Sequence, residues 1–335
     1  WPGGAKAPRF SPDGRSILFV GPTHPGAVTL EDNRKAAADR KARKYNARAY
    51  DSFPIRHWDR WLDELRPSLM VQPIDGASAA RDLLAASALR RERGFGGRLG
   101  NEGETIDAAW TPDGGGVVFA ATTNRHEGAR AQVNVSLWHV TVTGGEPRRL
   151  TGEEGDYSSP EFTPDGAMLL AKVQPASKRW VYSTDRLVRW SWPSLGDSQL
   201  VTRDFDESVG QYVPAPDSRR VFFLAERAGH DQLFEVPVAG GKPREVGKLE
   251  AGTYSRIAVG GAGKAPVVAA IWSSAVRPHE LGRVDMRAVQ QQQQQVQAAQ
   301  INYLRARSDE LSQRVNLHLV LGGSFAEPIA LAAAD

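Results

Sequence analysis

The chain has 335 residues, of which 41% are hydrophobic and 24% charged, a balance typical of a globular protein that could hold two domains. Its formal net charge of +3 is small for this length, and no basic face is interleaved with aromatic residues, so we expect no nucleic-acid partner. The absence of Cys excludes disulfides, thiolate catalysis and cysteine-ligated zinc, and no apolar run approaches the roughly 18 residues of a membrane span.

A turn sequence, Ser or Thr followed by Pro-Asp-Gly, recurs along the chain at a near-fixed spacing. Complete copies occupy residues 11–14, 111–114 and 163–166, and residues 215–218 form a degenerate copy. Pro presets φ, Asp accepts nearby hydrogen bonds and Gly adopts positive φ, so we assign these residues an architectural role and no catalytic one. The turn residues are Pro12, Asp13, Gly14, Pro112, Asp113, Gly114, Pro164, Asp165 and Gly166.

Each turn is followed by a short apolar run typical of a buried strand, at residues 16–20, 117–120, 168–171 and 221–224. Further strands joined by Gly-containing turns complete units of four strands, the strand count of a propeller blade. A fifth, weaker unit covers residues 256–285. We therefore predict an all-β protein whose residues 1–285 form a β-propeller of four or five four-stranded blades, in a ring that is either closed or incomplete.

A segment at about residues 31–64 interrupts the first blade. Its first part is rich in Ala, Arg and Lys and predicts a basic helical insertion with a solvated charged face. The insertion ends in the densest polar–aromatic cluster of the chain, Arg56, His57, Trp58 and Asp59. These residues either contact a substrate or an interface, or cap the blade through Trp while Arg pairs with Asp. A single His without a partner at ligand spacing does not make a metal site, and we expect no cofactor.

The C-terminal part differs in character from the repeats. Residues 290–295 are six consecutive Gln, and an apolar stripe from Ile301 to Leu319 steps by three and four residues. We predict a Gln-rich stretch and a long α-helix over residues 286–325, followed by a flexible tail at 326–335. Self-association through this helix or through open propeller edges is the expected route to an oligomer.

Together with the repeats, the cluster at residues 56–59 and the segment Gly-Gly-Glu-Pro-Arg-Arg-Leu-Thr at 144–151 carry a family resemblance. Residues 5–285 resemble the N-terminal β-propeller of prolyl oligopeptidase-family serine peptidases, in the acylaminoacyl- and dipeptidyl-peptidase branch. The resemblance implies a propeller that caps an α/β-hydrolase domain and restricts access to short peptides. It also implies a peptide or the hydrolase domain as partner, and the periplasm of a Gram-negative bacterium as location, with the cytoplasm as the other choice.

The chain departs from that family in three ways. It shows fewer blades than family propellers usually have, and it lacks the Gly-x-Ser-x-Gly elbow, since residues 322–326 read Gly-Gly-Ser-Phe-Ala. Residues 300–325 resemble instead the C-terminal helix of outer-membrane efflux factors. We assign no catalytic residue and expect a substrate-gating propeller, inactive alone, with the catalytic domain absent from this chain. The alternative is a stand-alone periplasmic propeller that binds peptides or proteins as a scaffold.

Overall fold

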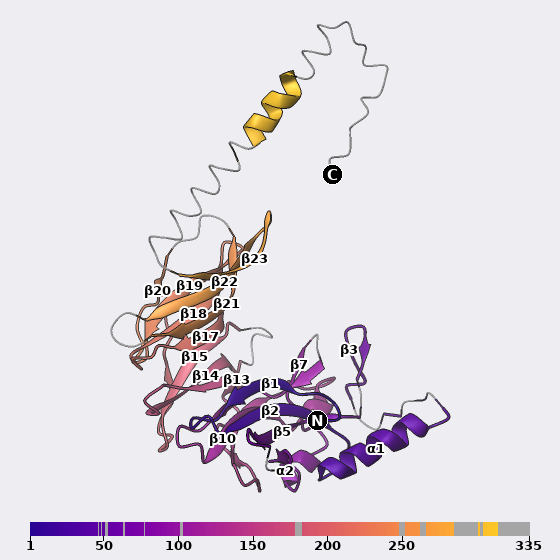
Figure 1. Cartoon of the computed structure of the whole chain (residues 1–335). Helices are drawn as coiled ribbons and strands as arrows, with labels where there is room; N and C mark the ends of the chain where they lie inside the picture. The colour runs from indigo at the N-terminus through magenta and orange to yellow at the C-terminus, as the bar shows by residue number, and fades with distance from the viewer. Residues whose placement is uncertain are drawn as a thin grey trace, which may run out of the picture. The chain divides into compact units, whose positions relative to one another are not determined.

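The computed structural model describes the chain apart from residues 46, 48, 51–52, 63, 77, 101–102, 178–182, 248–251, 262–265, 285–300, 302–303 and 314–335. The chain divides into two compact units, Trp1–Gly282 and Arg283–Asp335. The first unit contains five sheets of three or four strands, which follow one another along the chain from the indigo to the orange part of Figure 1. We number these sheets as blades I to V in chain order.

Within each blade, the strands are hydrogen-bonded to one another in the order in which they occur along the chain, as in a propeller. Blade I consists of β1 (Lys6–Phe10), β2 (Ser16–Thr23), β5 (Arg66–Pro73) and β6 (Arg81–Asp82). Blade II consists of β9 (Ala108–Trp110), β10 (Gly116–Thr122), β11 (Val135–Thr141) and β12 (Arg148–Arg149). Blade III consists of β13 (Gly155–Phe162), β14 (Met168–Pro175), β15 (Arg186–Ser191) and β16 (Gln199–Leu200).

Blade IV consists of β17 (Val209–Pro214), β18 (Arg220–Arg227), β19 (His230–Pro237) and β20 (Arg244–Glu245). Blade V has three strands in the described part of the chain: β21 (Thr253–Gly260), β22 (Val267–Ser274) and β23 (Arg277–Arg283). The predicted all-β propeller is therefore confirmed, with five blades. Whether the ring is closed or incomplete stays a prediction.

The Pro-Asp-Gly turns join the first two strands of successive blades and pack on one another. In blade II the Thr111 hydroxyl donates to Asp113 Oδ1 at 2.6 Å, and Gly114 N–H donates to the Thr111 carbonyl at 2.9 Å. Gly166 of the next turn has φ +72°, and a Cβ there would lie 2.7 Å from Cβ of Pro112. Glycine is thus required both by the backbone and by the neighbouring turn.

Three buried apolar clusters join successive blades. They connect blade I to II, II to III, and III to IV, and consist mainly of alternate residues of the long strands. In the last cluster the rings of Phe223 and Phe234 are stacked, with centroids 5.5 Å apart. Since stacked sheets bury one continuous core, these clusters hold the repeat together.

Polar groups also link the first strands of different blades. Trp110 Nε1 donates to the Arg9 carbonyl at 3.1 Å, and the Tyr212 hydroxyl donates to the Ser159 carbonyl at 2.6 Å. Arg9 forms an ion pair with Glu161 of blade III at 2.5 Å. Burial raises the pKa of Glu161, and the Arg9 guanidinium opposes that shift.

The expected helical insertion lies between β2 and β5 of blade I. Helix α1 (Leu30–Ala42) begins at a capping box, in which Thr29 accepts from Asp32 N–H and Asp32 accepts from Thr29 N–H. Its buried residue is Asn33, which accepts from His24 N–H at 2.8 Å and donates to the Thr29 carbonyl at 2.9 Å. The helix is therefore anchored by polar contacts and lacks an apolar face.

Shorter elements precede β5 and follow β6, the last two strands of blade I. The insertion continues into a hairpin of β3 (Arg56–His57) and β4 (Arg60–Trp61). Between blades I and II lie α2 (Ala88–Arg91), β7 (Arg98–Gly100) and β8 (Gly103–Thr105), and a 3-10 helix, η1 (Arg125–Glu127), follows β10. The two hairpins and η1 contribute residues to the cavity described below.

In the second unit, residues 304–313 are helical, in agreement with the predicted C-terminal helix. The Gln-rich stretch, the rest of that helix and the tail at 326–335 lie outside the described residues. Among the helices that the structure describes, none combines the length and apolar character needed to cross a membrane.

Candidate functional site

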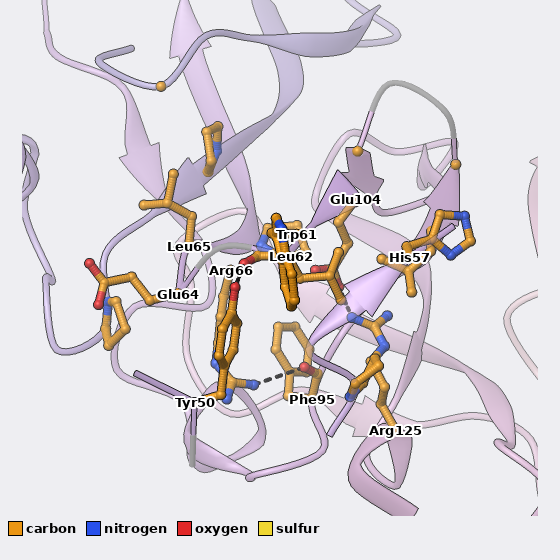
Figure 2. Close-up of a pocket in the computed structure, with 18 of the residues that line it drawn as sticks. Tyr50, His57, Trp61, Leu62, Glu64, Leu65, Arg66, Phe95, Glu104 and Arg125 are labelled. Atoms are coloured by element: carbon orange, nitrogen blue, oxygen red, sulfur yellow. Dashed lines mark hydrogen bonds and ion pairs between the residues drawn. The ribbon is translucent and has the colours of Figure 1, made fainter. Parts of the chain in front are cut away.

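A cavity of about 740 Å³ lies where the insertion meets blades I and II. The β3–β4 hairpin and the β7–β8 hairpin contribute to its wall, together with the end of β2 and the beginning of β5. Figure 2 shows its principal side chains, which come from segments far apart in the sequence: Tyr50, His57, Trp61, Leu62, Glu64, Leu65, Arg66, Phe95, Glu104 and Arg125.

The part of the wall formed by the insertion is aromatic. The rings of Tyr50 and Trp61 have centroids 6.4 Å apart, and the Tyr50 hydroxyl donates to the Leu62 carbonyl at 2.9 Å (Figure 2). Cζ of Arg56, which is paired with Trp61 in the hairpin, lies 6.0 Å from the Trp61 ring centroid. This cation–π contact and the Tyr50 hydrogen bond orient the two rings on the cavity side.

The part of the wall formed by the blades is cationic. Arg66, the first residue of β5, donates through Nη1 to the Phe95 carbonyl at 2.9 Å (Figure 2). Its Nη1 and Nη2 also lie 3.4 and 3.3 Å from the Arg93 carbonyl. Arg125 binds both the Glu104 carboxylate and the Gly97 carbonyl, so its charge is satisfied within the wall.

Glycines between the blades make this close packing feasible. A Cβ at Gly96 would lie 2.2 Å from Cζ of Arg125, and a Cβ at Gly97 would lie 1.9 Å from the Thr105 carbonyl oxygen. Gly97 N–H also donates to Glu104 Oε1 at 2.8 Å. Any larger residue would therefore displace Arg125 or open the β7–β8 hairpin.

A buried ion pair fixes the base of the insertion behind the cavity. Arg90 of α2 lies 2.6 Å from Asp82 and donates to the Thr23 hydroxyl at 2.7 Å and the Ala27 carbonyl at 3.0 Å. The Thr23 hydroxyl in turn donates to the Arg66 carbonyl at 3.0 Å. Burial raises the pKa of Asp82, although Arg90 and three hydrogen bonds favour its charged form.

The structure separates the four residues of the predicted polar–aromatic cluster. His57 lines the cavity, whereas Arg56 and Asp59 are exposed and Trp58, at the hairpin tip with φ +52°, is 82% exposed. Trp61, just beyond the cluster, is the Trp of this hairpin that lines the cavity. The assigned contact role of these four residues stays a prediction.

Sequence reasoning missed the residues that the blades contribute to the cavity. Arg66, Glu104 and Arg125 belong to segments that gave no motif, and the β7–β8 hairpin was not expected. One signal was present, since Gly94, Gly96 and Gly97 crowd a four-residue stretch between two predicted blades. Such a run of glycines indicates a close backbone approach. Within the described ranges, no group of three His, Asp or Glu side chains could hold a metal ion.

Comparisons with known proteins place this fold among peptidase propellers. No family model matches the chain. Over 251 residues it is 25% identical to dipeptidyl-peptidase 5 of Porphyromonas gingivalis. The aligned region covers 73% of this chain and 34% of that protein. The chain thus spans about a third of the length of this curated relative.

Solved structures share the fold at low sequence identity. An acylaminoacyl peptidase in complex with Z-Gly-Gly-Phe-chloromethyl ketone superposes with a TM-score of 0.56, at 16% identity, over 84% of this chain and 36% of that one. The β-propeller domain of the Trilobed protease from Pyrococcus furiosus superposes with a TM-score of 0.51, at 12% identity, over 83% of this chain and 64% of that one.

The first unit is therefore a β-propeller of the class found in acylaminoacyl peptidases. In sequence, the chain is similar to dipeptidyl-peptidase 5, and the expected resemblance to the peptidase propellers is confirmed. The resemblance of residues 300–325 to efflux factors stays a prediction, since most of that segment lies outside the described residues.

Proposed function

We propose that this chain is the substrate-gating propeller of a serine peptidase of the prolyl oligopeptidase family that acts on short peptides. The observation that carries the proposal is the similarity to dipeptidyl-peptidase 5 over 251 residues, in a chain without a Gly-x-Ser-x-Gly elbow. Since a Ser nucleophile needs that strained turn to meet its base and oxyanion donors, hydrolysis belongs to an α/β-hydrolase domain outside this chain.

The cavity supplies the peptide contact in this proposal. Its volume of about 740 Å³ falls in the range of about 300–1,000 Å³ usual for small-molecule sites. Tyr50 and Trp61 offer flat apolar surfaces for peptide side chains, and His57 and Arg66 offer polar contacts. Because the insertion hairpin forms part of the wall, it limits the length of peptide that fits, which is the gating role.

The partners follow from the same proposal. A short peptide occupies the cavity, and the hydrolase domain receives it for cleavage. Two copies of the chain associate through the C-terminal helix or through strand edges such as β23, an outer strand of the three-stranded blade V.

The test is peptide binding without turnover by the purified full chain. Fluorescence anisotropy of labelled tripeptides should show saturable binding, while chromogenic dipeptide substrates stay intact and a fluorophosphonate probe leaves the chain unlabelled. Trp61→Ala should weaken binding about tenfold or more, as expected for an aromatic side chain that the bound peptide covers.

Trp58→Asn is the matched control in the same hairpin. Trp58 does not line the cavity, and Asn tolerates its φ of +52°, so binding should be unchanged. Labelling of the chain by the probe would contradict the non-catalytic role. Absence of peptide binding, or equal losses in both variants, would contradict the peptide-contact role.

A further inference from the structure

Among the described residues, the cavity wall carries more positive than negative formal charge. The cationic side chains among them are Lys6, Arg66, Arg93 and Arg125, and the acidic ones are Glu64 and Glu104. The Arg125–Glu104 pair is internally neutral. A concave, partly apolar wall with an excess of one sign of charge concentrates ligands of the opposite sign.

Arg66 stands out because its hydrogen bonds all go to neutral carbonyl oxygens. Nη1 donates to the Phe95 carbonyl at 2.9 Å, and the Arg93 carbonyl lies within 3.4 Å of Nη1 and Nη2. Among the described residues, no carboxylate lies within the 4.0 Å that defines an ion pair. Within the described part of the chain, these bonds leave Nε–H and one Nη2–H of the guanidinium unused.

The backbone that holds Arg66 is itself firmly placed. Phe95 is 2% exposed and belongs to the core cluster between blades I and II. Gly96, the next residue, exchanges two backbone hydrogen bonds with Thr122 of β10, at 3.1 and 2.9 Å. The guanidinium is thus held at one edge by rigid carbonyls, so its free edge is ordered before any ligand arrives.

The unused Nε and Nη2 protons form one side of the planar fork that binds a carboxylate bidentately. We propose that Arg66 binds a carboxylate group of the peptide, so that the cavity selects peptides by that group. This inference rests on the proposed peptide-binding function and names the chemistry it selects. Tyr50 and Trp61 then pack against the peptide next to the carboxylate.

Two peptide groups carry this chemistry, the C-terminal carboxylate and an Asp or Glu side chain. Three N-terminally labelled probes separate them: Ala-Ala-Phe as free acid, Ala-Ala-Phe as C-terminal amide, and Ala-Glu-Phe as C-terminal amide. The free acid should bind the wild-type chain about tenfold or more tightly than Ala-Ala-Phe amide if the C-terminus is read, as expected for a charge-assisted pair. If the cavity binds an acidic side chain instead, Ala-Glu-Phe amide should bind about tenfold or more tightly than Ala-Ala-Phe amide.

Variants of the full chain assign the effect to Arg66. Arg66→Gln should remove the advantage of the acidic probe over Ala-Ala-Phe amide. Arg66→Lys keeps the charge but loses the fork, so it should recover only part of the advantage. Arg148→Gln, an exposed arginine on β12 outside the cavity, is the matched control and should bind like wild type.

The outcomes separate this inference from the function on which it rests. If wild type binds all three probes equally, or Arg66→Gln keeps the preference for the acidic one, carboxylate binding by Arg66 is refuted while peptide binding stands. If wild type binds none of them, the proposed function itself is contradicted. Should Arg66→Gln fail to fold by circular dichroism, the comparison of acid and amide on wild type and Arg66→Lys still decides.

Discussion

Replacing Arg90 with Met tests whether the buried ion pair behind the cavity supports the first unit. The Arg90 and Asp82 side chains are 8% and 2% exposed, and their contact is 2.6 Å. The substitution leaves the Asp82 carboxylate without its cation, and the Ala27 carbonyl and Thr23 hydroxyl without a donor. We expect the Arg90→Met variant to lose stability through these uncompensated groups.

The magnitude follows from the partners that remain. Removing one member of a buried pair costs about 3–5 kcal/mol of the free energy of unfolding. Asp82 still accepts from the Ser68 hydroxyl at 2.5 Å and from Leu84 N–H at 2.9 Å. These two donors place the expected loss at the lower end, about 3 kcal/mol.

The pH dependence provides an independent check. Burial already raises the pKa of Asp82 above its ordinary 3.8, and loss of Arg90 removes an opposing charge and raises it further. Between the unfolded and folded pKa values the folded state holds the proton, so stability falls as pH rises through that window. The deficit of Arg90→Met should therefore be smaller near pH 3.8 than at neutral pH.

Urea unfolding followed by far-UV circular dichroism measures both effects. Arg91→Met is the matched control, because Arg91 is exposed and donates only to the Ala86 carbonyl at 3.2 Å among the described residues. The control should lie within about 0.5 kcal/mol of wild type. A deficit of Arg90→Met below about 1 kcal/mol, or one that is independent of pH, would refute the reasoning.

Two further predictions concern the Pro-Asp-Gly turns. Gly166→Ala should destabilise by about 1–3 kcal/mol more than Gly229→Ala in urea unfolding, because both have positive φ but only Gly166 would press its Cβ against Pro112. Asp113→Asn should be about 1 kcal/mol less stable than wild type at neutral pH, since the Thr111 hydroxyl and a backbone N–H lower the pKa of Asp113. That stabilisation is present above pH 3.8 and lost as pH falls, so the two proteins should converge in acid.

Clear outcomes would count against these expectations. Equal losses at Gly166 and Gly229 would mean that the turns do not press on one another. A constant difference between Asp113→Asn and wild type from neutral to acidic pH would mean that the carboxylate charge does not stabilise the turn.

The repeat was predictable from sequence because its determinants are local. The Pro-Asp-Gly turns and the apolar runs after them act within about ten residues, so the first hairpin of each blade can be predicted from its local sequence alone. The insertion helix could be predicted for the same reason, from its local composition.

The cavity was much less predictable, because its wall is assembled from distant segments. Trp58 belongs to the predicted cluster and Trp61 lies just beyond it, yet Trp58 is at an exposed hairpin tip and Trp61 is on the cavity wall. A hairpin with two-residue strands has no periodic pattern from which its faces could be read. Arg66 likewise reads as an ordinary strand start, and only its carbonyl partners distinguish it.

The position of the insertion has a consequence for how such a chain can acquire new surface. The insertion joins β2 to β5, whereas the packed turns join the first two strands of each blade, so the two connections lie at opposite ends of β2. In blade IV the equivalent connection is the tight link from Arg227 to His230. Replacing a two-residue connection by one of about forty residues raises the free-energy cost of loop closure by only about 3 kcal/mol, because this cost grows with the logarithm of loop length. One or two buried side chains offset this cost. The end of the propeller that carries the insertion can therefore accept long connections, while the packed turns at the other end keep the spacing of the blades constant.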